Sequence, residues 1–541
     1  MEIGQADASA ARRAAAGGAA GAPAPRGLHA LARLVDWDVR RVSAAGLTAT
    51  ILIAIGSYGA GSLPANDPTR HLPVIGLLRH GWVGLHVSLG FYYLGLALLI
   101  TAWLVLGRIL LTGSGGGTTE ANPTGAGQPL AKRAAASPDR PADVIDSGRM
   151  LRISLRWMLP LLAGMPLASM DLYSYAAQAR LAEAGYDPYK FTPADLPGKF
   201  LDNVAWKWLD TPSPYGPLWV TVSRWTSTLI GDHALISVFV LRLIPFAAIV
   251  GTALLLPGLA RRLGHRADLA LWLAIANPLV LVHGVGGGHN DAVMIFLMVA
   301  GLSVVLAEHA DWRHLALGAA LMSLAAAVKA PGAVGVAFIV PIYLAGRPNL
   351  RIRDWFTHCL LAAGAAVPVF ALITWMVGYG NGWTKQVSPS VPVISLMSIP
   401  TTLAVVWGLI TGQPHAGILV DHTVRAFRRV GSVVSALWLT YLWFRATRGA
   451  ALQLMALALL SVVLLSPAVQ PWYFTWALTP AALFLIRPRE IFWVASASVS
   501  LSLLVQPMGS GVGLVPYVPT VLVACLAARA LLGPVIQHVR A

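Results

Sequence analysis

The chain has 541 residues, of which 56% are hydrophobic and only 11% charged, and its mean hydropathy is +0.66. A water-soluble protein of this length needs more charge to cover its surface, so the composition excludes one. The formal net charge of +16 comes from short basic clusters between apolar runs. This pattern argues against nucleic-acid binding and is typical of positively charged loops on the cytoplasmic side of a membrane.

The apolar runs are predicted to be membrane-spanning helices. Crossing about 30 Å of hydrocarbon takes roughly 20 apolar residues in a helix, and lipid allows only helices or closed barrels to span it. The runs are long and lack the alternation of barrel strands. Both cysteines, Cys359 and Cys525, fall inside such runs, so no disulfide framework is predicted.

The runs and the polar stretches between them divide the chain into parts. The first stretch is rich in Ala, Gly and Arg and shows no cleavable signal peptide, and a later one is rich in Gly, Thr, Ser and Pro. The predicted parts are a disordered cytoplasmic leader (1–44), an N-terminal two-helix module (45–112), a flexible cytoplasmic linker (113–150) and a transmembrane core (151–541).

The predicted fold is an all-α polytopic membrane protein with about fourteen spanning helices and both termini inside. The spans are expected near 45–61, 82–112, 151–169, 235–257, 269–284, 292–308, 313–328, 332–346, 355–378, 428–446, 450–466, 471–486, 491–506 and 515–533. The core helix at 151–169 delivers Asp171 to the outer surface.

Two long outer-face segments are predicted, at about 170–232 and 379–427, and each carries a short interfacial helix. These helices are expected at 216–231 and 393–411. The alternative counts 393–411 as a span, which would reverse the orientation of the chain after it.

The unusual polar and aromatic sequence gathers on the predicted outer face. The motifs there are Asp171-Leu-Tyr-Ser-Tyr175, Gly185-Tyr-Asp-Pro-Tyr189, Pro214-Tyr-Gly-Pro217, Gly286-Gly-Gly-His-Asn-Asp291 and Gln470-Pro-Trp-Tyr473. Chance would spread such residues over both faces, so a site on the outer face is predicted.

A carboxylate at the outer end of the first core helix, followed by a long outer loop, resembles the GT-C superfamily of polyprenyl-phosphate-sugar glycosyltransferases. With Asn277-Pro-Leu279 and Val328-Lys-Ala-Pro331, the motifs in their order are similar to those of the actinobacterial polyprenyl-phosphomannose-dependent α-1,6-mannosyltransferases. The matches run from about residue 45 to 530. Those enzymes build the mannan backbone of lipomannan and lipoarabinomannan.

The resemblance implies an enzyme of the plasma membrane whose active site faces the extracytoplasmic side. Its donor would be polyprenyl-phosphomannose, its acceptor a mannan glycolipid, and the anomeric centre would be inverted. A single displacement needs one general base and a way to hold the departing phosphate. No cofactor is required on this scheme, and no divalent metal is expected, because the Gly-rich motif supplies too few ligands.

Asp171 is the predicted general base; the alternative is a helix-end carboxylate that contacts water or an amide. Lys329 and Arg242 are the predicted ligands of the donor phosphate, since two cations there stabilise the departing charge. A cation at membrane depth usually has a partner. For Lys329 the alternative partner is a backbone carbonyl or one of the outer acids.

The remaining candidates are predicted to contact the donor or acceptor sugar. They are Tyr173, Tyr175, Tyr215, His289, Asn290, Asp291, Gln470, Trp472 and Tyr473. Aromatic faces stack on sugar C–H groups, although a membrane-interface belt explains the same rings. The glycines before His289 lack the lysine and hydroxyl of a P-loop, and the alternative for His289 and Asp291 is that they satisfy each other.

Two other functions remain open at this point. One is a related GT-C arabinosyltransferase or a mannan-branching enzyme, because donor identity depends on a few pocket contacts. The other is a lipid-linked sugar flippase or transporter. Transporters tend to show internal repeats and ionisable residues near the midplane, and this sequence shows neither.

Overall fold

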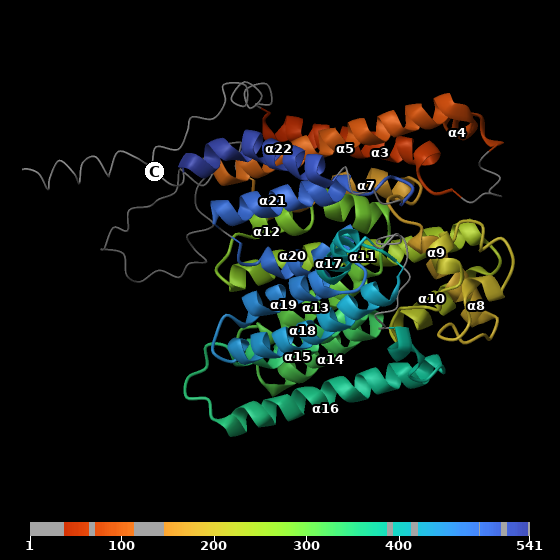
Figure 1. The fold of residues 1–541 in the computed structure, drawn as a ribbon. Helices are drawn as coiled ribbons and strands as arrows, with labels where there is room; N and C mark the ends of the chain where they lie inside the picture. The colour runs from red at the N-terminus through yellow and green to blue at the C-terminus, as the bar shows by residue number, and fades with distance from the viewer. Residues whose placement is uncertain are drawn as a thin grey trace, which may run out of the picture.

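The structure is a computed structural model that describes residues 37–63, 71–112, 145–386, 393–412, 420–485, 487–509 and 517–538. Most of the predicted leader and linker, residues 1–36 and 113–144, lies outside the described residues. Its long helices lie side by side with their axes running in roughly the same direction (Figure 1). In that view α5 and α16 lie near opposite edges of the molecule, and α8, α9 and α10 gather at one end.

The regular elements of the described chain are helices. The first group comprises α3 (Val39–Ala60), α4 (Pro73–Arg79), α5 (Gly81–Thr112), α7 (Ser147–Ala163), α8 (Asp171–Glu183), η2 (Pro193–Asp195), α9 (Trp206–Leu209) and α10 (Pro217–Ile230). The middle of the chain forms α11 (Ala234–Arg262), α12 (Ala267–Ala274), η3 (Val280–Gly286), α13 (Asp291–Val305), α14 (Trp312–Val328), η4 (Ala330–Gly332), α15 (Ala333–Leu344) and α16 (Ile352–Val377). The last group is η5 (Gly382–Gln386), α17 (Ile399–Ile410), α18 (His422–Ala446), α19 (Ala451–Leu465), η6 (Pro471–Phe474), α20 (Thr475–Ala481), α21 (Pro488–Leu503) and α22 (Tyr517–His538).

Four of the described helices, α3, α5, α11 and α16, are long and apolar enough to cross a membrane. A fifth span results if η3 and α13, which are bent by 109° relative to each other, count as one broken span. The all-helical fold class is therefore confirmed, whereas length and hydropathy support four to five spans rather than the predicted fourteen. The other predicted ranges overlap helices that are shorter or more polar.

Helix α16 has the surface expected of a helix against lipid. Only Ala362, Ala366 and Val377 are buried along it, whereas Phe356 is 70% and Trp375 77% exposed. In water such a row of exposed apolar side chains is unfavourable, but in hydrocarbon it carries no such cost. These exposed faces support a multi-pass membrane protein.

The N-terminal helix pair packs tightly on the rest of the chain. Trp103 of α5 and Trp272 of α12 stack at 4.9 Å and each donates its indole N–H to the other's backbone carbonyl, at 3.0 and 2.8 Å. Trp157 of α7 donates to the Ser43 carbonyl of α3 at 3.0 Å. Buried Tyr and Trp N–H or O–H groups need such partners, so these contacts fix how the helices meet.

The helix bounds differ from prediction in three places. Helix α3 begins at Val39, inside the predicted leader, because the Asp38 carboxylate caps it by accepting from Arg41 N. The predicted span 151–169 ends at Ala163, and Asp171 begins a separate helix instead of ending that span. The predicted span 471–486 is reduced to η6 and the seven-residue α20.

The interfacial helices expected at 216–231 and 393–411 are confirmed as helices by α10 and α17.

Candidate active site

Asp171 is positioned by the break between α7 and α8. Gly164 and Pro166 end the apolar run, since proline has no N–H to donate and restrains the residue before it. The end of α3 then holds this connection: Met165 N donates to Ser57 Oγ at 2.8 Å, and Ser62 N donates to the Pro166 carbonyl at 3.0 Å. The result is a fixed approach to the first turn of α8.

The Gly-rich motif forms a second tight connection, between η3 and α13. Gly288 has φ of +65°, a left-handed conformation that favours glycine. A Cβ there would lie 2.8 Å from Leu172 Cδ1 and 3.0 Å from Arg242 Cγ. The motif therefore uses this glycine to bring His289 and Asn290 against the first turn of α8.

Arg242 of α11 joins the two connections from within. Its side chain is fully buried, and its guanidinium donates to the carbonyls of Leu161 at 2.5 Å, Gly164 at 2.6 Å and Val285 at 2.9 Å. These acceptors include carbonyls that helix ends leave without partners. The Arg242 guanidinium therefore binds backbone carbonyls, and these contacts do not support the prediction that it binds a phosphate.

Asp171 faces His289. Oδ2 of Asp171 lies 3.3 Å from Nδ1 of His289, and the Asp171 side chain is 14% exposed. The His289 ring stacks on the Trp472 ring, with centroids 3.7 Å apart and an angle of 13° between the planes. Stacking on Trp472 and the contact with the Asp171 carboxylate are what hold the imidazole.

Burial alone would raise the pKa of the Asp171 carboxyl group. The opposing effects of His289, Lys207 and Lys329 are larger together, and the pKa lies below its usual value of 3.8. The carboxylate is therefore ionised at neutral pH and able to accept a proton.

Asp291 and Lys329 form a second charged pair beside the first. Lys329 Nζ lies 2.8 and 3.0 Å from the two carboxylate oxygens of Asp291, and Trp476 donates its indole N–H to the same carboxylate at 2.6 Å. The Asp291 side chain is 3% exposed. Lys329 therefore has an acid, Asp291, as its partner, which is one of the alternatives given by the sequence. His289 and Asp291 do not pair with each other, because His289 contacts Asp171 and Asp291 binds Lys329 and Trp476.

Aromatic rings surround these charges. Lys329 Nζ lies 4.3 Å from the ring centroid of Tyr473, 5.4 Å from that of Trp476 and 6.0 Å from that of Tyr215. Cation–π attraction adds to the ion pair at such distances. Tyr175 lies edge-on to Tyr215 at 5.0 Å, and so it belongs to the same aromatic wall.

Tyr175 also holds the Gly-rich connection. Its hydroxyl donates to Asn290 Oδ1 at 3.3 Å and accepts from Asn290 N at 3.5 Å. Tyr173 points elsewhere: its hydroxyl donates to the Ser62 carbonyl at 2.6 Å, at the end of α3. Gln470 is half-buried and precedes η6. The predicted sugar contact of Tyr173 therefore has no support from where its hydroxyl lies.

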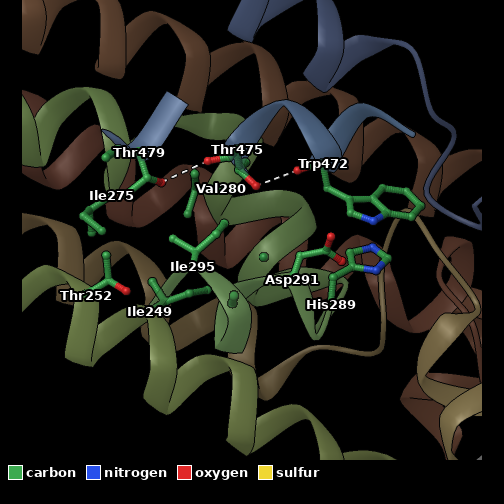
Figure 2. A pocket seen from close by; sticks show the side chains of 13 residues that line it. Ile249, Thr252, Ile275, Val280, His289, Asp291, Ile295, Trp472, Thr475 and Thr479 are labelled. Carbon is green, nitrogen blue, oxygen red and sulfur yellow. Dashed lines mark hydrogen bonds between the residues drawn. The ribbon is translucent and has the colours of Figure 1, made fainter. Parts of the chain in front are cut away.

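A cavity opens beside the two charged pairs. His289, Asp291 and Trp472 line one side of it, and Ile275 and Thr479 line the other. Figure 2 shows the three site residues close together and the apolar side chains extending away from them. A polar end beside a mainly apolar channel suits a ligand with a polar head and a hydrocarbon part.

Two residues of this region were not predicted from the sequence. Trp476 lies in an apolar run and carries no pattern that distinguishes it from a membrane-belt tryptophan. Lys207 lies in α9, near enough to Asp171 for its charge to lower that pKa, and forms no ion pair within the described residues. The sequence signal for Lys207 is its place between Trp206 and Trp208 in a long polar segment.

No group of three or more His, Cys, Asp and Glu side chains that could hold a metal occurs among the described residues. The prediction that no metal is needed stays a prediction.

Comparison with known families gives matches along most of the chain. Residues 43–345 match the family described as alpha-(1->6)-mannopyranosyltransferase, N-terminal domain. Residues 400–533 match the family described as MptB C-terminal domain. The Gly-rich motif, Lys329 and Asp171 all fall in the first match, whereas Trp472 and Trp476 fall in the second.

Individual relatives are similar over nearly the whole length. The chain is 33% identical to alpha-(1->6)-mannopyranosyltransferase A of Mycobacterium tuberculosis over 86% of its own length and 84% of the relative's. It is 32% identical to a probable alpha-(1->6)-mannopyranosyltransferase of Mycolicibacterium smegmatis, covering 89% and 85%. With alpha-(1->6)-mannopyranosyltransferase B of Corynebacterium glutamicum the identity is 27%, covering 86% and 76%.

Proposed function

The chain belongs to the alpha-(1->6)-mannopyranosyltransferase family, and on that premise we propose that it transfers mannose from polyprenyl-phosphomannose to a growing α-1,6-mannan. The reaction inverts the anomeric centre and takes place at the outer face of the plasma membrane. The observation that carries the proposal is the contact between the Asp171 carboxylate and His289, a residue that lines a cavity with mainly apolar walls.

In the proposed reaction Asp171 accepts the proton of the acceptor hydroxyl. That oxygen forms the new bond to the anomeric carbon of mannose, while the bond from this carbon to the phosphate oxygen breaks and its electron pair leaves with the phosphate. The depressed pKa of Asp171 keeps the base ready at neutral pH, although it makes the base weak. The departing phosphate therefore has to be stabilised well.

Lys207 and Lys329 are the proposed contacts of the departing phosphate. Lys329 is neutralised in part by Asp291, whereas Lys207 forms no ion pair among the described residues and its charge lowers the pKa of Asp171. A preorganised cation near a developing charge lowers the barrier without reorganising during the reaction. For Arg242 we propose that it positions the backbone around Asp171, because its donors are already used on carbonyls.

The sugar and the lipid are proposed to lie on either side of these charges. Trp472, Tyr473 and Tyr215 offer ring faces for the sugar. Ile249, Ile275 and Ile295 line the apolar part of the cavity, which suits the first units of a polyprenyl chain. The acceptor is proposed to be a mannan glycolipid, and the reaction to need no cofactor.

The membrane arrangement proposed with this function keeps about fourteen helices in the bilayer, with Asp171 on the extracytoplasmic side. The overlap of each predicted range with a helix supports it, as do the basic clusters Arg261/Arg262 and Arg445/Arg448 at the predicted cytoplasmic ends. Helices too short to cross on their own can do so as broken pairs, as η3 and α13 illustrate.

Donor identity is tested in washed membranes that contain the full-length chain. Polyprenyl-phosphomannose and polyprenyl-phosphoarabinose are supplied side by side with a short α-1,6-mannoside, and the product linkage is determined by NMR. We expect mannose transfer with an α-1,6 linkage. Arabinose transfer, or a branched linkage, would replace the proposal with the related GT-C arabinosyltransferase or branching enzyme. A flippase would move the lipid without any product.

A further inference from the structure

A second cavity lies where α3 and α7 begin. It is lined by Val39, Arg40, Ser43, Ala44, Arg149, Arg152, Ile153 and Arg156. Half of these side chains are arginines, and they come from two different helices. No residue of the candidate active site takes part.

The arginines have few acidic partners. Arg40, Arg152 and Arg156 form no salt bridge with any acid of the described residues. The nearest acids along the chain cap the two helices: Asp38 accepts from Arg41 N and Asp146 accepts from Arg149 N, both at 2.7 Å. The helix N-termini add positive partial charge to the same place.

The cavity lies at the opposite end of α7 from Asp171. Helix α7 has 17 residues, which corresponds to a length of about 25 Å. Arg152 and Arg156 are four residues apart, so they stand on one face of α7, whereas Met150, Ile153 and Trp157 face the protein. Arginines near the end of a membrane helix extend toward the headgroup region, where anionic lipids supply counter-ions.

We propose that this cavity binds the phosphate headgroup of an anionic phospholipid. Arginine forks match phosphate oxygens in pairs of hydrogen bonds, and basic pockets between membrane helices suit anionic lipid headgroups. Leu159, three residues after Arg156 on α7 and 59% exposed, provides with the exposed Ala44 an apolar surface for the start of the acyl chains. A free phosphate would satisfy the arginines but not these apolar contacts.

The site also couples the N-terminal helix pair to the core. The ligand would touch α3 through Arg40 and α7 through Arg152 and Arg156, close to the hydrogen bond from Trp157 to Ser43. Binding to the folded state alone stabilises it, so the lipid raises the melting temperature.

The test uses the purified full-length chain in detergent and counts lipid adducts by native mass spectrometry, with melting temperatures measured alongside. The probes are short-chain phosphatidylglycerol, the matching phosphatidylcholine, and inorganic phosphate, all at equal concentration. The variant is Arg152→Gln with Arg156→Gln. The control is Arg445→Gln with Arg448→Gln, which removes the same charge from exposed arginines elsewhere.

We expect phosphatidylglycerol adducts and a raised melting temperature for the wild type and the control, and at least about tenfold weaker binding in the Arg152/Arg156 variant. Arg40→Gln, a milder change on the other helix, should weaken binding severalfold. Equal binding of phosphatidylcholine, a full effect of inorganic phosphate alone, equal loss in the control, or unchanged binding in the variants would each overturn the proposal.

Discussion

The two ends of α7 carry charge in opposite ways. At the end that leads to Asp171, buried charges have partners: Arg242 donates to carbonyls, Lys329 pairs with Asp291, and Asp171 faces His289. At the other end, Arg40, Arg152 and Arg156 line an open cavity and form no salt bridge with an acid of the described residues.

The charges near Asp171 are held by partners within the protein, whereas the arginines at the other end of α7 are available to bind a ligand. A buried charge with fixed partners costs no reorganisation when a reaction develops new charge beside it. An arginine at the membrane edge without a partner keeps its binding capacity. The Asp171 end is thus organised before substrate arrives, whereas the basic end becomes complete only when an anion binds.

The largest expected effect comes from breaking the pair of Lys329 and Asp291. Lys329→Ala leaves a buried carboxylate without its cation, which costs about 3–5 kcal/mol of unfolding free energy. Thermal unfolding in detergent should therefore shift strongly, and mannose transfer should be lost. Lys199→Ala, which breaks the exposed pair with Asp232, serves as the control and should change neither.

The double variant Lys329→Met with Asp291→Asn separates structure from catalysis. It removes both charges, so stability should recover relative to Lys329→Ala while transfer stays low. Recovery of full transfer would show that the pair has only a structural role.

A smaller loss is expected when Arg242 is replaced by lysine. The charge remains, but one ammonium group cannot reach the three carbonyls of Leu161, Gly164 and Val285. We expect a loss of about 1–3 kcal/mol in unfolding free energy and a lower kcat with little change in donor KM. A rise in donor KM alone would instead assign Arg242 to the phosphate. Arg261→Lys is the matched control on the same helix.

Gly288→Ala tests the tight connection before Asp291. The alanine must adopt a φ of +65°, and its Cβ would lie too close to Leu172. We expect a loss of about 1–2 kcal/mol in unfolding free energy and reduced mannose transfer. Gly258→Ala in α11 meets nothing within 4 Å and should leave both unchanged. Equal effects of the two changes on thermal unfolding and transfer would contradict the account.

The smallest change is expected in the pH profile of a His289→Gln variant. Burial raises the pKa of Asp171 and His289 is the foremost group opposing it, so removing the imidazole moves this pKa upward. The ionised carboxylate is the active form, hence activity is full above its pKa and lost below it. The acid limb of kcat/KM should therefore lie at higher pH in the variant than in the wild type. An acid limb at the same pH in both proteins would show that His289 does not affect the pKa of the catalytic base.

The helices were predictable from the sequence because lipid requires long apolar runs, and most runs coincide with a helix. The break after Ala163 was missed because Gly164 and Pro166 lie inside an apolar run that looks continuous. The separation of Asp171 into its own helix followed from that error. The lengths of the apolar runs therefore predict how many runs there are, but not where a helix within a run ends or bends.

The sequence predicts which residues belong to the candidate site better than it predicts which of them contact each other. Asp171, His289, Lys329 and Trp472 were singled out from motifs and do lie together. Which acid pairs with Lys329 depends on contacts between residues 38 positions apart, which no local pattern contains. For the same reason the carbonyl partners of Arg242 could not be anticipated.

The central claim, that Asp171 is the general base, is tested most directly by Asp171→Asn. Mannose transfer from polyprenyl-phosphomannose to a short α-1,6-mannoside is measured in washed membranes, with the amount of protein determined by immunoblot. We expect a loss of about 10²–10⁴-fold at unchanged protein level. Asp210→Asn, an exposed carboxylate of the same segment, should retain full activity. Retained transfer in Asp171→Asn would contradict the assignment.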